Sequence, residues 1–159
     1  MNSENEFPLS WDGLVKGTSV GLFVLLVALV LIFGVVLGDL RATVGMLSLF
    51  ACILLMPLLW APQSYSLDGN VVTVRRRIGE VKIHVAEAPE RWNGRGWGLR
   101  LFGSGGLYGY FGYFYVRAIG SVHMYATNRH TMVLLVDEEG RKSVVSPNEP
   151  DRLIQRLKK

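Results

Sequence analysis

The chain has 159 residues, with 17 lysines and arginines against 13 aspartates and glutamates, so its formal net charge is +4. Its hydrophobic fraction is 50%, and its single cysteine excludes an internal disulfide and a multi-cysteine metal site. The modest charge also argues against a nucleic-acid-binding protein.

Two long apolar stretches, residues 19–38 and 42–62, dominate the first part of the chain and contain no charged side chain. A bilayer core of about 30 Å requires about 20 apolar residues in helical form, so each stretch is long enough to span once. Only Asp39, Leu40 and Arg41 join them. The sequence therefore predicts an antiparallel helical hairpin with both of its outer ends on one side of a membrane.

The distribution of positive charge predicts the orientation of this hairpin. Lys16 and Arg41 are the only basic residues before position 63, and the other 15 follow it. Because basic residues favour the inner side, both termini are expected in the cytoplasm, at the inner (plasma) membrane. Trp11 and Trp60 flank the hairpin as interfacial anchors. The expected division is a cytoplasmic tail at 1–18, a transmembrane hairpin at 19–62 and a cytoplasmic domain at 63–159.

The pattern changes from continuous to alternating at Tyr65, as is typical of strands with one buried face. In the first such strand Val72 and Val74 alternate with Thr73 and Arg75, and Arg76 is an exception to the alternation. Residues 86–97 read as a loop. Further strands are expected at 81–85, near 98–102, and at 122–126, 132–136 and 142–145.

The last residues predict an amphipathic helix. Ser146 and Glu149 have the spacing of a capping box, and Asn148 is an alternative cap. Leu153, Ile154 and Leu157 then form one apolar stripe. Together with the strands, this predicts an all-β barrel or sandwich of about seven strands, closed by a C-terminal amphipathic helix.

Four segments of the soluble part together carry a resemblance to a known family. They are Ser64–Asn70, Val74–Arg77, Leu99–Tyr110 and Val122–Asn128. These segments resemble the bacterial PH-like (pleckstrin-homology-like) domain family, and the resemblance covers about residues 64–155. It implies a seven-stranded PH-like barrel that serves as a binding scaffold in a bacterial or archaeal membrane protein, and it implies no enzyme.

Residues 102–115 are chemically unusual, because seven of the 14 are aromatic, five are glycine and none is charged. One interpretation is a loop or bulged hairpin whose rings pack on the barrel. Contact with the bilayer interface, a surface for a partner protein, and a glycine nest for an anion are the alternatives. The candidate binding surface comprises Arg100, Phe102, Gly103, Gly105, Gly106, Tyr108, Tyr110 and Phe111.

A basic cluster follows the hairpin, formed by Arg75, Arg76, Arg77 and Lys82. Basic residues close to a membrane are attracted to anionic lipid by about 1 kcal/mol each, so these four are candidates to face lipid. A solvated strand face is the alternative interpretation.

No pattern in the chain indicates catalysis. His84, His123 and His130 lack a second ligand at metal-binding spacing, and no Gly-x-Ser-x-Gly elbow occurs. We therefore expect a non-catalytic, membrane-anchored module without cofactor or metal, which engages a protein partner or its own copies and no nucleic acid. A lipid-headgroup or anion sensor, with Arg75, Arg77 and Arg100 on the headgroups, is one alternative. A small accessory subunit of a larger membrane complex is the other.

Overall fold

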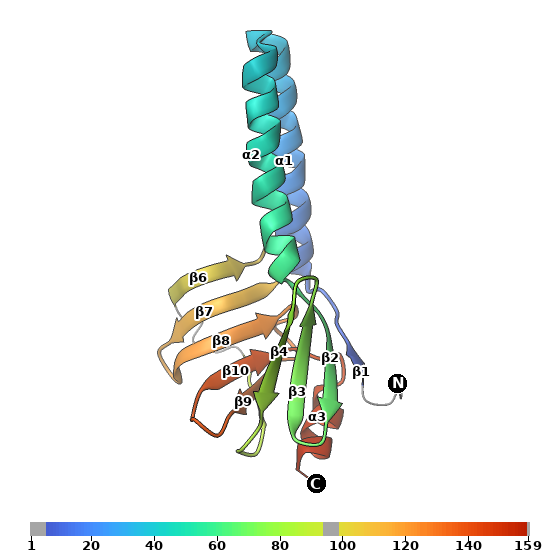
Figure 1. Cartoon of the computed structure of the whole chain (residues 1–159), viewed down its shortest axis with the longest axis vertical. Coiled ribbons are helices and arrows are strands. Elements are labelled where there is room, and N and C mark those ends of the chain that lie inside the picture. Colours follow the sequence, from blue (N-terminus) through green and yellow to red (C-terminus); the bar gives the residue numbers. More distant parts are fainter. Residues whose placement is uncertain (1–5, 94–98, 159) are drawn as a thin grey trace.

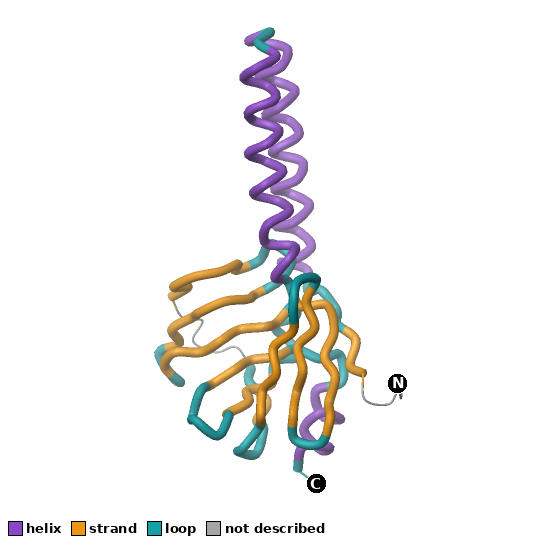
Figure 2. Tube along the Cα trace, in the orientation of Figure 1, coloured by secondary structure: helices purple, strands orange, loops and turns teal. Residues whose placement is uncertain are grey.

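The computed structural model describes residues 6–93 and 99–158, and it consists of a long helical hairpin on a domain of two β-sheets (Figure 1). The hairpin rises away from all of the strands, and the short third helix lies beside the C-terminus (Figure 2). The helices are α1 (Gly13–Leu37), α2 (Leu40–Trp60) and α3 (Pro150–Leu157). The strands are β1 (Glu6–Pro8), β2 (Pro62–Asp68), β3 (Val71–Arg76), β4 (Glu80–His84), β5 (Glu90–Arg91), β6 (Leu99–Gly105), β7 (Tyr110–Val116), β8 (Gly120–Ala126), β9 (Val133–Val136) and β10 (Lys142–Val145).

The hairpin is capped by an aspartate at the start of each helix. Asp12 caps α1 and Asp39 caps α2, while Gly38 ends α1 in the left-handed conformation with φ 58°. Both helices are long and apolar enough to cross a membrane, judged by length and composition.

Helix α1 begins six residues before the predicted boundary at residue 19. Val15 and Ser19 are buried against the sheet domain, so the first two turns belong to that domain. The remaining residues, Val20 to Leu37, rise by about 27 Å, which is close to the thickness of a bilayer core.

Of the barrel and the sandwich that the sequence left open, the sheet domain is not a closed barrel but a pair of sheets, and it has more than the expected seven or so strands. One sheet has four strands in the order β1-β2-β3-β4, and the other has six in the order β5-β9-β10-β8-β7-β6. Isolated bridges, Val85 to Asp137 and Leu9 to Pro147, are the backbone pairings between the two sheet regions. On the side of β6, β7 and β8 the sheets diverge, as Figure 1 shows, so the structure is an open sandwich.

Strand alternation gives the six-stranded sheet two apolar faces. One face, with Val133, Leu135 and Val145, packs against the four-stranded sheet and against Leu153 of α3. The opposite face, which includes Phe114 and Met124, packs against Val15 of α1. The larger sheet is therefore covered on both sides, and α1 contributes to one of the two cores.

Three local predictions need correction. The predicted tail contains strand β1, which pairs with β2 and places Phe7 fully in the core. The predicted loop 86–97 contains the short strand β5. The expected capping box does not form, because the Ser146 hydroxyl accepts the N–H of Thr127 instead, and Glu149 is the N-cap without a side-chain hydrogen bond.

The glycine-aromatic segment forms the hairpin of β6 and β7, one of the interpretations that the sequence left open. Gly103 faces Gly112 across this hairpin, and both have positive φ, 109° and 117°. A Cβ on Gly103 would lie 2.0 Å from the carbonyl oxygen of Phe111. Glycine is therefore required where these two strands approach each other.

We predict that Gly103→Ala destabilises the domain by at least ~2 kcal/mol, because the methyl group meets backbone and the φ is unfavourable. Gly105→Ala is the matched control on the same strand, since its Cβ would meet only the Arg100 side chain at 3.6 Å. Urea unfolding of the full chain in detergent, followed by tryptophan fluorescence, measures both. Equal stability of the two variants would contradict the close approach of the strands.

Candidate functional site

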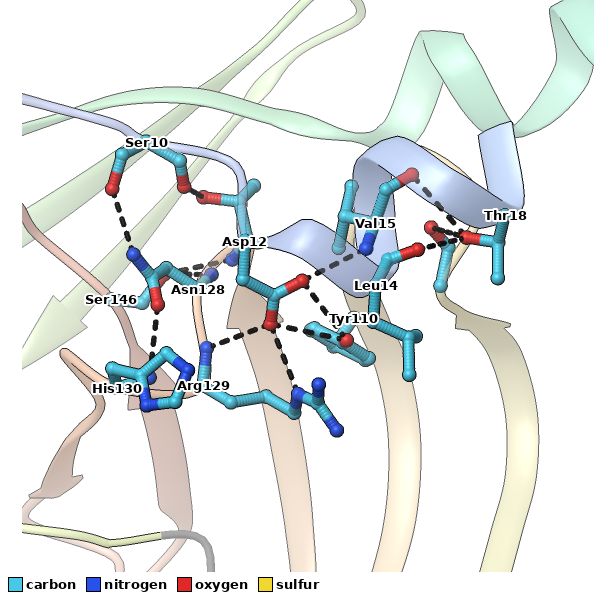
Figure 3. A network of polar contacts seen from close by, with 12 residues as sticks. Ser10, Asp12, Leu14, Val15, Thr18, Tyr110, Asn128, Arg129, His130 and Ser146 are labelled. Carbon is cyan, nitrogen blue, oxygen red and sulfur yellow. Dashed lines mark hydrogen bonds and ion pairs between the residues drawn. The ribbon is translucent and has the colours of Figure 1, made fainter. Parts of the chain in front are cut away.

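The carboxylate of Asp12 joins the start of α1 to the sheet domain (Figure 3). Its Oδ1 accepts the N–H of Val15 at 2.8 Å, which caps the helix. Its Oδ2 accepts the backbone N–H of Arg129 at 3.2 Å and the Nε–H of the same residue at 3.0 Å. The hydroxyl of Tyr110 donates to the same carboxylate at 3.3 Å. One buried side chain thus links α1, β7 and the loop after β8.

Asp12, Val15, Tyr110 and Arg129 form a network that we call the joint. Its electrostatics favour the ionised form of the Asp12 carboxylate. Burial acts to raise the pKa of Asp12, but the hydrogen bonds from Val15 and Arg129 outweigh it and leave the pKa below 3.8. Burial, followed by the negative charge of Asp12, raises the pKa of Tyr110 to about 12. At neutral pH, Asp12 is therefore charged, while the Tyr110 hydroxyl stays protonated and acts as a hydrogen-bond donor to the carboxylate.

A second set of hydrogen bonds extends the joint toward β2 and β10. Thr127 Oγ1 donates to the carbonyl of Ser10 at 2.8 Å, and Asn128 Nδ2 donates to Ser10 Oγ at 2.9 Å. The hydroxyl of Tyr65 donates to the Tyr125 carbonyl and accepts the N–H of Ser146. The segment before α1 is thereby fixed on the loop after β8.

The turn between β6 and β7 holds the next turn of α1. Thr18 Oγ1 donates to the carbonyl of Gly106 at 2.8 Å, and the N–H of Tyr108 donates to Ser19 Oγ at 3.1 Å. The ring of Tyr108 also lies 6.0 Å from that of Trp11, centroid to centroid. The first two turns of α1, which we call its foot, therefore contact the sheet domain.

A pocket of about 500 Å³ lies on the other face of the sheet, where the two sheets diverge. Its walls come from the last two turns of α2, which we call the foot of that helix, from the end of β3, and from strands β6, β7 and β8. The residues that line it are Met56, Pro57, Trp60, Arg76, Phe102, Gly103, Ser104, Phe111, Gly112, Tyr113, His123 and Tyr125.

Arg76 is the one charged residue in this lining at neutral pH. Val72, Val74 and Arg76 alternate along β3, so Arg76 lies on the same inward face of the sheet as the two valines. This position explains why Arg76 is an exception to the alternation of apolar and polar residues in the sequence. Its Nε is buried without a hydrogen-bond acceptor in the part of the chain that the structure describes. Burial, and then the charge of Arg141, lowers the pKa of His123 below 6.5, so that imidazole is neutral.

The eight residues of the predicted binding surface fall into separate groups. Phe102, Gly103 and Phe111 line the pocket. Gly106, Tyr108 and Tyr110 contact the foot of α1 through the bonds given above. Arg100 and Gly105 lie near each other on β6, with Arg100 exposed to solvent.

The glycine nest for an anion was one of the alternatives that the sequence left open, and the backbone at these glycines forms a strand and a turn instead. Gly103 and Gly105 lie in the ladder between β6 and β7, and the N–H of Gly106 donates to the carbonyl of Gly109 at 3.0 Å. These N–H groups therefore do not converge on a common ligand position.

The predicted basic cluster is also divided. Arg75 pairs with Glu6 at 3.3 Å and Lys82 with Glu80 at 3.5 Å, all of them largely exposed. Arg77 borders a smaller pocket beside Trp11, and Arg76 points into the space between the sheets. Trp60 also lines the larger pocket, so both interfacial tryptophans lie where the hairpin meets the sheets.

Sequence analysis missed Asp12 and Arg129. Asp12 carries a usable signal, because an aspartate directly before a long apolar run is a common helix N-cap. Arg129 carries none, because its partner lies 117 positions away in the chain. No group of three or more His, Cys, Asp or Glu residues that could hold a metal occurs within residues 6–93 and 99–158.

We predict that Asp12→Ala destabilises the chain by about 2–4 kcal/mol, because a helix cap is lost together with the ion pair and hydrogen bonds that Arg129 and Tyr110 make with this buried carboxylate. Asp39→Ala is the matched control, since Asp39 also caps a helix but is exposed at the hairpin tip. Its expected cost is about 1 kcal/mol. Urea unfolding in detergent measures both, and an equal cost would show that Asp12 acts as a cap alone.

The low pKa of Asp12 also predicts a pH dependence of unfolding. A carboxyl group whose pKa is lower in the folded chain stabilises it above the unfolded pKa, and this stability is lost as pH falls through the folded value. Below about pH 4, the wild type should therefore lose more stability than Asp12→Asn, which keeps a capping side chain without the charge. Parallel pH profiles of the two unfolding free energies would contradict this assignment.

The comparisons with known proteins concern the sheet domain. A family model described as "Bacterial PH domain" matches residues 63–159, which is more than half of the chain. No curated protein and no solved structure gives a match. Strand β1 and helix α1 lie outside the matched region, although both contribute to its cores. On this match, and with its two packed sheets and C-terminal helix, the chain belongs to the bacterial PH domain family.

Proposed function

We propose that this chain is a non-catalytic, membrane-anchored binding module whose PH domain receives a protein partner at the cytoplasmic face. The family supports the general class, because PH-like domains are generally binding modules without catalytic activity. The apolar hairpin supports membrane anchoring, and the charge distribution supports the cytoplasmic orientation.

Strand β6 is the observation that carries the protein partner. It is the edge of the six-stranded sheet, so its outer backbone groups pair with no strand among the described residues. Leu99, Leu101 and Phe102 on this strand are 70%, 57% and 77% exposed. An exposed apolar edge strand is a template for a strand from another protein.

The position of β6 also suits this function. It is the uppermost strand in Figure 1, on the side from which the hairpin rises, so an anchored domain presents it close to the bilayer surface. A partner that adds a strand there would be either another membrane protein or a second copy of this chain.

Photocrosslinking tests the proposal in carbonate-washed membranes. We predict that a benzophenone side chain at Leu101 forms a discrete protein adduct, because this residue lies on the open edge. Two differently tagged copies of the chain distinguish a second copy from another protein.

The matched control is the same probe at Ile78, which is also apolar and 53% exposed, near the foot of α2 but away from β6. Protein adducts are expected at Leu101 and not at Ile78. Lipid adducts alone at Leu101, or equal protein adducts at both positions, would contradict a partner on β6.

A further inference from the structure

The pocket between the sheets has a membrane-facing wall, provided that the hairpin is anchored as proposed above. Met56, Pro57 and Trp60 form this wall, and they belong to the last two turns of α2. Trp60 is 43% exposed, as is common for a ring at the bilayer interface. A molecule in the bilayer could reach this pocket without crossing bulk water.

The lining favours an amphipathic occupant. Phe102, Phe111, Tyr113 and Tyr125 provide aromatic surface, and Met56 adds a flexible apolar side chain. A volume of about 500 Å³ lies within the range of small-molecule sites and suits a headgroup with the adjoining part of a chain.

Arg76 gives the pocket a positive charge that forms no ion pair with a carboxylate in the described part of the chain. The acidic residues next to it on the four-stranded sheet are engaged elsewhere, Glu6 with Arg75 and Glu80 with Lys82. The Nε of Arg76 has no acceptor among the described residues. Arg76 as a whole is partly buried, and a buried N–H donor without an acceptor is costly, so the site is suited to a ligand that supplies an anionic or carbonyl oxygen.

We propose that this pocket binds one anionic phospholipid, with its phosphate on Arg76 and its apolar part along the foot of α2. The lipid enters laterally from the leaflet, while its chains remain largely in the bilayer. A water-soluble anion would leave the aromatic walls without a partner, and a peptide strand has the open edge of β6 available to it instead.

The proposal separates this site from the exposed basic residues. Arg75 lies one position away on the same strand, but its side chain is paired with Glu6 on the solvent side. A general attraction of lipid to surface charge would involve both arginines. A lipid in the pocket requires only Arg76.

Native mass spectrometry of the full chain in mild detergent tests this difference, with phosphatidylglycerol or phosphatidylcholine added at equal concentration. The wild type should retain one phosphatidylglycerol. Arg76→Leu should weaken its retention at least about tenfold, as expected for loss of a charge-assisted hydrogen bond. Arg75→Leu should retain the lipid as the wild type does.

A second pair of variants leaves Arg76 and the sheets unchanged. Met56→Trp fills the pocket from α2 and should also reduce retention, whereas Leu55→Trp, at a neighbouring exposed position outside the lining, should not. Circular dichroism of each variant confirms that the fold is intact.

Retention of phosphatidylglycerol by Arg76→Leu, equal loss in Arg75→Leu, or equal retention of phosphatidylcholine by the wild type would overturn the proposal. Carbonate extraction distinguishes this failure from that of the anchor. A chain that stays in carbonate-washed membranes but retains no lipid is anchored without this site. A chain released by carbonate would overturn both the membrane anchor and the lipid site.

Discussion

The buried carboxylate of Asp12 connects parts of the molecule that otherwise share little surface. It caps α1, accepts from Tyr110 on β7 and pairs with Arg129 after β8. A buried charge is tolerated only where such partners are held in place, so the joint has one arrangement that satisfies all of its groups. Together with the hydrogen bonds of Thr18 and Ser19 to the turn between β6 and β7, this side chain holds the start of α1 against the sheets.

The two helices meet the larger sheet on opposite faces. Val15 of α1 packs on one face of the six-stranded sheet, and Trp60 of α2 lines the pocket on the opposite face. The β6–β8 end of the sheet is therefore held between the feet of the two helices. Because α2 forms one wall of the pocket, the pocket exists only in the complete chain, and anything bound there contacts the anchor and both sheets at once.

Local patterns predicted much of this fold, and distant contacts account for what they missed. Alternation identified most of β3, β4 and β8, and continuous apolarity identified the two helices. Phe7 lies too far from Tyr65 in the chain for a pattern to reveal their pairing, so β1 was taken as part of a tail. Gly103, Gly105 and Gly106 suggested a nest, but Gly103 serves, together with Gly112, the close approach of two strands. Two local signals went unused, namely the N-cap position of Asp12 before an apolar run and the register of Arg76, which placed a charge on the inward face.

Exposed basic residues have a different role in a domain that is anchored by its own hairpin. A domain that must find the membrane from solution needs exposed basic residues, each of which gives about 1 kcal/mol near anionic lipid. A domain attached through its own hairpin does not, and here Arg75 and Lys82 are paired with carboxylates. Such exposed pairs contribute little to stability, but they neutralise the surface. Arg76, whose side chain forms no ion pair among the described residues, instead lines the pocket between the sheets, where its charge can select a ligand rather than recruit the protein.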